Sequence, residues 1–194
     1  NINDCVISNK KLCESVKKTT GEVDVLMSQF SYANWKGNPD DKEIRERSAK
    51  EKLNRIKIQT EIFNPKYTIP FASFVYFSHD DNKYMNDSIN TISTAHEYIN
   101  NNTDSESIVM YPGDTWDFES KFNSEKSIKL YDKAYSQISN LNYRSLSTTV
   151  SDKELLQASQ KYLSSLNTNN SSLAMSDIRS SEIKLLPFGV TLPI

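Results

Sequence analysis

Histidine and cysteine are scarce in this chain, because each occurs only twice among 194 residues. Two histidines cannot build a multi-histidine metal centre without other ligands. Cys5 and Cys13 are too few and too close together for a disulfide framework, which favours a reducing cytoplasm. The four glycines form neither a Gly-x-Gly-x-x-Gly nor a Gly-x-x-x-x-Gly-Lys pattern, so the standard phosphate-binding loops are absent.

Long apolar runs and an excess of one charge are also missing. No stretch of about 18 apolar residues occurs, and no basic segment followed by an apolar run opens the sequence, so we expect neither a membrane span nor an export signal. The 23 basic and 25 acidic residues nearly cancel. This balance argues against nucleic acid as a partner, although a local basic patch would escape the argument. The sequence contains no Gly-x-Ser-x-Gly motif, so nothing in it indicates a serine nucleophile.

What the chain does contain is enough material for a globular core. Its length suits one domain with an appendage. Ten tyrosines and eight phenylalanines supply large apolar units. We therefore expect one α/β domain with a very polar surface.

Strands and helices are predicted to alternate in the first two thirds of the chain. A helix is expected from a cap at Ser8 to about Thr19, and a long one from Asn38-Pro39 to about Phe63. A further helix carries Ile89, Ile92 and Ile99. Strands are expected at the start of the chain and at 23–30, 67–72 and 107–111. This succession predicts a largely parallel sheet, whose sites collect at the carboxyl ends of its strands.

After Phe118 the pattern becomes mainly helical. Ile128, Tyr131, Tyr135 and Ile138 recur at helical spacing, and Ser151-Asp-Lys-Glu154 is a capping box. We expect a domain over residues 1–118, a helical hairpin over 119–168, and a linker with a terminal strand over 169–194. The buried stripe of the long helix is predicted to be Ala49, Leu53, Ile56 and Phe63.

Three segments of the sequence resemble a known family. Asn3-Asp4-Cys5, Val25-Leu-Met-Ser-Gln-Phe-Ser-Tyr-Ala-Asn-Trp35 and Pro65-Lys-Tyr-Thr-Ile-Pro-Phe-Ala-Ser73 look like the C-terminal half of a metallo-beta-lactamase-fold hydrolase. They are most similar to the branch that includes the hydrolase part of CMP-N-acetylneuraminate hydroxylase and its bacterial relatives. The resemblance runs to about Phe118 and implies half of an αββα sandwich.

The resemblance also implies a metal site. Asp4 matches the aspartate that bridges two metals, and His79 is the nearest candidate for the last histidine ligand. The family's His-x-His-x-Asp-His loop is not in this chain, so the other ligands would come from a missing N-terminal half of the same domain. Zinc suits such ligands, although iron or manganese would also fit. Read from spacing alone, Asp4 could simply cap a turn, and His79 could belong to a solvated polar loop.

Five more residues are candidates for supporting roles. Asp80 or Asp81 could accept the second N–H of the His79 imidazole. Tyr32 and Trp35 could wall a substrate pocket or cover the edge of the core. Asp114 could reach the site or only shape a turn. His96 and Cys5 read as structural residues.

The function expected from the resemblance is hydrolysis of an ester, phosphoester or amide by metal-activated water. The parent's substrate would be a small molecule, or one resembling a lipid or a nucleotide sugar, and this chain alone is expected to be inactive. The rival hypothesis is a non-catalytic protein-binding or scaffold module. The two differ in whether Asp4 and His79 lie at one edge of the sheet.

Overall fold

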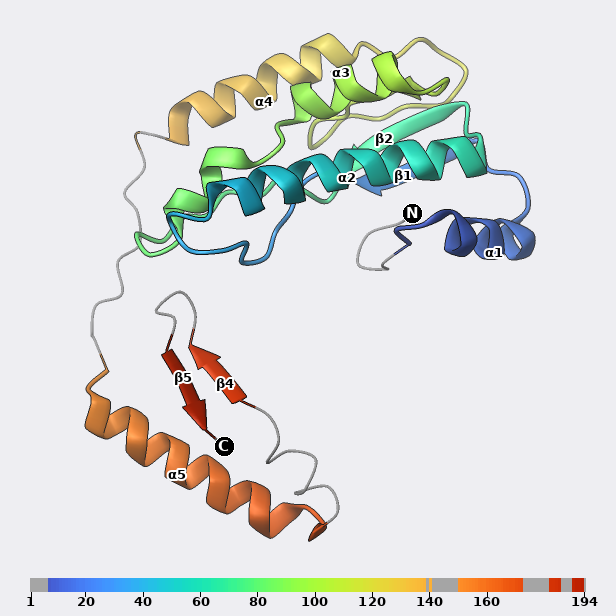
Figure 1. The fold of residues 1–194 in the computed structure, drawn as a ribbon. Helices are drawn as coiled ribbons and strands as arrows, with labels where there is room; N and C mark the ends of the chain where they lie inside the picture. Colours follow the sequence, from blue (N-terminus) through green and yellow to red (C-terminus); the bar gives the residue numbers. More distant parts are fainter. Residues whose placement is uncertain (1–6, 139, 141–149, 173–181, 186–189, 194) are drawn as a thin grey trace. The chain divides into compact units, whose positions relative to one another are not determined.

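The computed structural model of the protein describes residues 7–138, 140, 150–172, 182–185 and 190–193. The chain divides into two compact units, Asn1–Arg144 and Ser145–Ile194. The first holds an α/β arrangement (Figure 1), in agreement with the predicted class.

The sheet of the first unit has three parallel strands in the order β1-β2-β3. They are β1 (Val25–Gln29), β2 (Tyr67–Phe71) and the short β3 (Glu106–Ser107). Met27 pairs with Ile69 at the middle of the β1–β2 ladder. The predicted parallel order is confirmed for these strands, while the strand expected at residues 1–5 lies outside the described residues.

Helix α1 (Lys10–Thr20) begins at Asn9, whose side chain accepts a hydrogen bond from the Leu12 N–H at 3.0 Å. The expected cap at Ser8 was therefore one residue early. The helix ends close to the expected Thr19, and Gly21 caps it with a φ of 75° that favours glycine.

Helix α2 (Lys42–Phe63) starts later than the Asn38-Pro39 signal predicts. The Asp41 carboxylate accepts the Asn38 N–H at 2.8 Å, which folds the preceding residues into a turn instead of a first helical turn. The predicted stripe is confirmed, because Ala49, Leu53, Ile56 and Phe63 are all buried.

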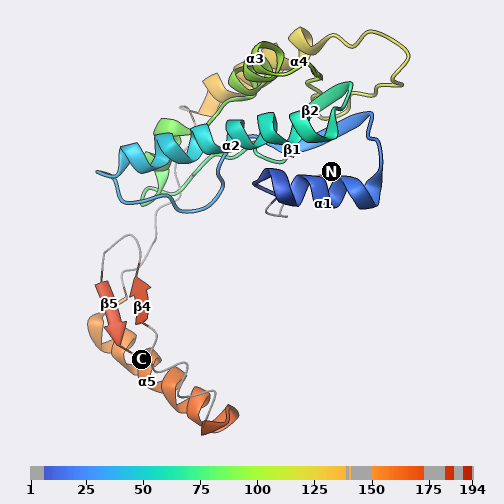
Figure 2. The same cartoon turned by 45° about the vertical axis from the view of Figure 1, so that its right-hand side comes forward.

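The remaining helices of the first unit are α3 (Ile92–Asn102) and α4 (Ser124–Ile138), with a short 3-10 helix η1 (Lys83–Ser88) before α3. Figures 1 and 2 both show α3 and α4 side by side. Tyr131 of α4 belongs to the same buried cluster as Ile92 and Ile99 of α3. Helix α4 is thus part of the first unit.

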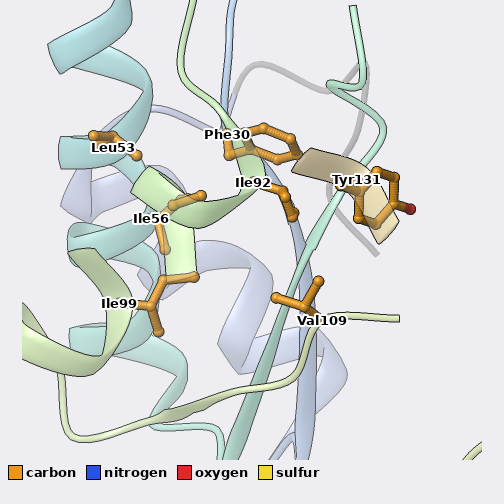
Figure 3. Packing of buried hydrophobic residues seen from close by; sticks show 8 residues of the cluster. Phe30, Leu53, Ile56, Ile92, Ile99, Val109 and Tyr131 are labelled. Atoms are coloured by element: carbon orange, nitrogen blue, oxygen red, sulfur yellow. The ribbon is translucent and has the colours of Figure 1, made fainter. Parts of the chain in front are cut away.

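The main core lies between the helices and the sheet (Figure 3). Phe30 follows β1, Ile56 lies on α2 and Val109 follows β3, and each is fully buried. A second cluster joins Cys13 of α1 to Leu26 of β1, so α1 is fastened to the same layer.

The second unit contains α5 (Asp152–Asn169) and the antiparallel pair β4 (Glu182–Leu185) and β5 (Val190–Pro193). The predicted capping box is confirmed, because the Ser151 and Glu154 side chains each bond the other's backbone N–H. The helices α4 and α5, predicted to form one hairpin, fall in different units.

Candidate functional site

One face of the sheet is turned toward the helices. The Ser28 hydroxyl donates to Oε1 of Gln59 on α2 at 2.5 Å, and Leu26 packs in a cluster with α1. Because successive strand residues point to opposite faces, the residues between these buried ones lie on the other face. We call this the open sheet face. It consists of Val25, Met27 and Gln29 of β1, Tyr67, Ile69 and Phe71 of β2, and Glu106 of β3, which pairs with Tyr67.

The open sheet face is mainly apolar, and its polar groups are the Tyr67 hydroxyl, Gln29 at the carboxyl end of β1 and the exposed Glu106 of β3. Its residues on β1 and β2 are half-buried, and in the described part of the chain no core cluster includes any of them. Parallel sheets are almost always covered on both faces. This face is therefore a surface that suits a further apolar layer.

An aromatic loop continues the open sheet face at its amino end. The Trp116 ring meets the Tyr67 ring edge-on at 4.7 Å and lies 4.6 Å from the Phe118 ring. Phe118 is 55% exposed and has a φ of 66°, which is rare for a bulky residue. The apolar surface thus extends beyond the strands onto the loop after β3.

His79 lies in a tight polar turn after β2. Its N–H donates to the Asn82 side chain at 3.1 Å, and its carbonyl accepts the Lys83 N–H at 2.9 Å. No hydrogen bond links the imidazole to another described residue. Asp80 pairs with Lys83 at 2.9 Å, and both Asp80 and Asp81 are exposed. Asp4 lies outside the described residues, so its expected approach to His79 stays a prediction.

The donor types on this loop suit a metal ion, but they do not complete a site. Among the described residues, no three His, Cys, Asp or Glu side chains are grouped so that they could hold an ion. An imidazole and carboxylates are good zinc ligands. Any metal held by His79 would thus need ligands from elsewhere.

Polar groups buried at the carboxyl edge of the sheet satisfy one another. The Asn90 side chain donates to the carbonyls of Phe30 (2.7 Å) and Ala49 (2.8 Å), and its N–H donates to the Ser31 hydroxyl (3.0 Å). The Ser73 hydroxyl accepts the Phe30 N–H at 3.0 Å. This network ties strand ends to helices and is structural.

Among the residues that the structure describes, Arg45 of α2 is the largest fully buried side chain. Its guanidinium donates to both carboxylate oxygens of Asp87 at 2.9 and 2.8 Å, and to the carbonyls of Asn38 at 2.6 Å and Pro39 at 2.9 Å. The Tyr84 ring lies 5.1 Å from it. The hydrogen bond from Arg45 lowers the pKa of Asp87. The arginine joins three segments through four of its five N–H groups, and with 1% exposure it holds the fold together and offers no surface to a substrate.

Three other candidates have clear positions. Tyr32 is fully buried and donates to the Met85 carbonyl at 2.5 Å, and burial raises its pKa to about 12. It belongs to a core cluster with Ala49, Phe77 and Met85. Trp35 is 39% exposed. Asp114 accepts hydrogen bonds from the Ser127 hydroxyl and the Tyr111 N–H, both at 2.7 Å, so it shapes the turn after β3.

A polar hollow of about 520 Å³ lies at the opposite, amino edge of the sheet. The ends of α2 and α3 and the residues that follow them form its walls. No candidate residue was predicted there, because asparagine-rich helix ends read as ordinary turns. The hollow is lined by Lys57, Thr60, Glu61, Asn64, Pro65 and residues 101–105.

His96 lies next to this region and is half-buried on α3. Its Nε2 is 3.2 Å from the Asn100 side-chain nitrogen, and its Nδ1 is buried without a hydrogen-bond partner in the described chain. Burial lowers the pKa of His96. The reading as a structural histidine agrees with this position.

Comparisons with protein-family profiles, curated proteins and solved structures found no match to the chain. None of the helices in the described ranges is long and apolar enough to cross a membrane.

Proposed function

We propose that the chain is the C-terminal half of a metal-dependent hydrolase with an αββα sandwich fold. The open sheet face carries this proposal. In such a sandwich each sheet has helices on one face and the second sheet on the other, so half of it would expose one apolar face. Apart from Gln29 and Glu106, the open sheet face has that composition, and the helices lie on the opposite side of the strands.

The position of His79 supports the same proposal. It follows β2 after a short connection, at the carboxyl edge where sites collect in parallel sheets. In the proposed centre His79 and Asp4 would be ligands, and Asp80 or Asp81 would orient the imidazole. Zinc, iron or manganese, once bound, would supply hydroxide near neutral pH. The remaining ligands would come from the second half of the sandwich.

Metal analysis of the protein expressed from its intact coding region tests the proposal. We expect one or two ions of zinc, iron or manganese per chain. His79→Ala should weaken metal affinity at least about tenfold, because even residues that only orient metal ligands contribute 10- to 100-fold. Competition with a chelator, followed by elemental analysis, measures the change.

The other histidine provides the control. His96→Ala removes an imidazole on α3 and should leave metal affinity unchanged. Equal metal content in the parent and in His79→Ala would contradict the proposal. The 194-residue chain by itself is expected to hold no ion tightly, and stoichiometric metal in it would refute the claim that it is half of the site.

A second candidate function is a protein-binding module, and α5 is the observation that favours it. Leu155, Tyr162 and Leu166 share one side of this helix, and Leu156 beside them is 59% exposed. The described part of α5 contains no buried residue. Helices of this length owe most of their stability to packing of an apolar face, so a partner would stabilise α5.

Substitution on α5 tests the binding module. Leu155→Glu places a charge on the apolar side and is expected to reduce co-purification of a bound protein about tenfold or more, as for an interface hot spot. Gln157→Glu adds the same charge on the opposite side and should have little effect. Quantitative affinity purification from the native source measures both. Equal recovery with the two variants would exclude α5 as the binding surface.

A further inference from the structure

Asn100 on α3 links a histidine to the backbone of the edge strand. Its Oδ1 accepts the Ser107 N–H of β3 at 2.9 Å, and its Nδ2 lies 3.2 Å from Nε2 of His96. A backbone N–H can only donate, so Oδ1 must face Ser107 and Nδ2 must face the histidine. The hydrogen bond to the strand therefore fixes the orientation of the Asn100 side-chain amide.

We call the two contacts of Asn100, with His96 and with the Ser107 N–H, the relay. The relay determines where the proton of His96 lies. Nδ2 of Asn100 is a donor, so Nε2 of His96 has to accept. In a neutral imidazole with Nε2 as acceptor, the proton is on Nδ1. Nδ1 is the atom that is buried without a partner among the described residues.

A second proton on His96 is incompatible with the relay. The imidazolium would present an N–H at Nε2 to the NH₂ group of Asn100, and two donors cannot bond. Turning the amide over would place that NH₂ against the Ser107 N–H instead. Either way one hydrogen bond of the relay is lost.

The relay closes the loop that lines the polar hollow. Residues 101–105 lie between Asn100 and Ser107, and all of them face the hollow at the amino edge of the sheet. β3 pairs with β2 over only two residue pairs, with backbone hydrogen bonds from Glu106 and Ile108, and the Asn100 bond to the Ser107 N–H adds a tie from α3 to the strand between them. We infer that the relay from His96 through Asn100 to Ser107 is an acid-sensitive latch on the wall of this hollow.

The surroundings of His96 set the pH range of the latch. Burial lowers its pKa, while the carboxylates of Glu97 on α3 and Glu125 on α4 oppose that shift. The folded form therefore binds the proton less readily than an unfolded chain, whose histidine has a pKa near 6.5. The latch is closed above that value, and its stabilising contribution is lost as the pH falls toward the lowered pKa.

Amide hydrogen exchange at Ser107 tests the latch. After correction for intrinsic exchange, we expect protection to fall about five- to tenfold as His96 is protonated, the size expected for one hydrogen bond. In His96→Gln a side-chain carbonyl replaces the accepting nitrogen without titrating, so protection should stay constant. His79→Gln, which removes the other histidine, should behave as the parent. Unchanged protection in the parent while His96 titrates would overturn the inference.

The tautomer of His96 can also be measured in the parent protein, so that this test does not depend on whether the variants fold. Nitrogen-15 chemical shifts of His96 near pH 7.5 should show an unprotonated Nε2 and a protonated Nδ1. The opposite tautomer would refute the latch.

Discussion

Replacing Arg45 by methionine is expected to lower the free energy of unfolding by about 3 kcal/mol, because the change breaks a buried ion pair by removing one partner. Methionine keeps much of the volume but none of the donors. Asp87 would lose its bidentate partner, and the carbonyls of Asn38 and Pro39 would lose their hydrogen bonds. Asp87 is 32% exposed and gains some hydration, which places the value at the lower end of the range for such pairs. Urea unfolding measures the loss.

Arg55 on the same helix is the matched control. It pairs with Glu51, whose side chain is 57% exposed, and exposed pairs contribute little. Arg55→Met should cost at most about 0.5 kcal/mol. A loss from Arg45→Met no larger than that from Arg55→Met would contradict the structural role assigned to Arg45.

The Arg45 effect should also depend on pH. The hydrogen bond from Arg45 lowers the pKa of Asp87 below its ordinary value of 3.8. The pair therefore stabilises the folded state fully above that value and loses its contribution as the pH falls through the lowered pKa. The stability difference between the parent and Arg45→Met should accordingly narrow in acid.

Truncation of Ile56 to alanine is expected to cost about 3–4 kcal/mol. Ile56 is fully buried and contributes to the cluster with Phe30, Ile92 and Ile99 (Figure 3). The cost combines lost burial with the cavity left between α2, α3 and the sheet, which can relax only in part. Thermal or urea unfolding measures it.

Ile44 allows the same substitution at an exposed position of α2. It is 40% exposed, so Ile44→Ala should change stability by no more than about 1 kcal/mol. Similar losses at the two positions would mean that α2 does not bury the predicted stripe.

Much of the fold is legible in the sequence because its signals are local and agree. The stripe of α2 follows from helical spacing, and Ala49, Leu53 and Ile56 are buried as that spacing predicts. The capping box at Ser151 forms with both hydrogen bonds. Three parallel strands follow from the alternation of apolar runs with helices.

The predicted end of the third strand was wrong, because side chains replace the backbone partners that a longer strand would need. The strand expected at 107–111 pairs only at its start. The Val109 N–H donates to the Ser124 hydroxyl at 3.0 Å, and the Tyr111 N–H donates to Asp114 at 2.7 Å. These partners come from later in the chain, so periodicity cannot reveal them.

The candidate site was less accessible to sequence reasoning. Arg45 was not among the predicted core or site residues, yet it is 1% exposed. Its role depends on Asp87, 42 positions away. The signal that could have found it is the four-residue spacing from Ala49, which places Arg45 on the buried stripe.

The buried thiol of Cys13 offers a way to measure how fast α1 detaches from the rest of the first unit. The side chain is fully buried against Leu26 and Phe63, and burial raises its pKa, so the reactive thiolate is suppressed. A thiol-modifying reagent reaches Cys13 only when α1 leaves α2. In a Cys5→Ser variant, the rate of Cys13 alkylation would give the rate at which α1 detaches. That rate can be compared with the rate of global unfolding of the unit.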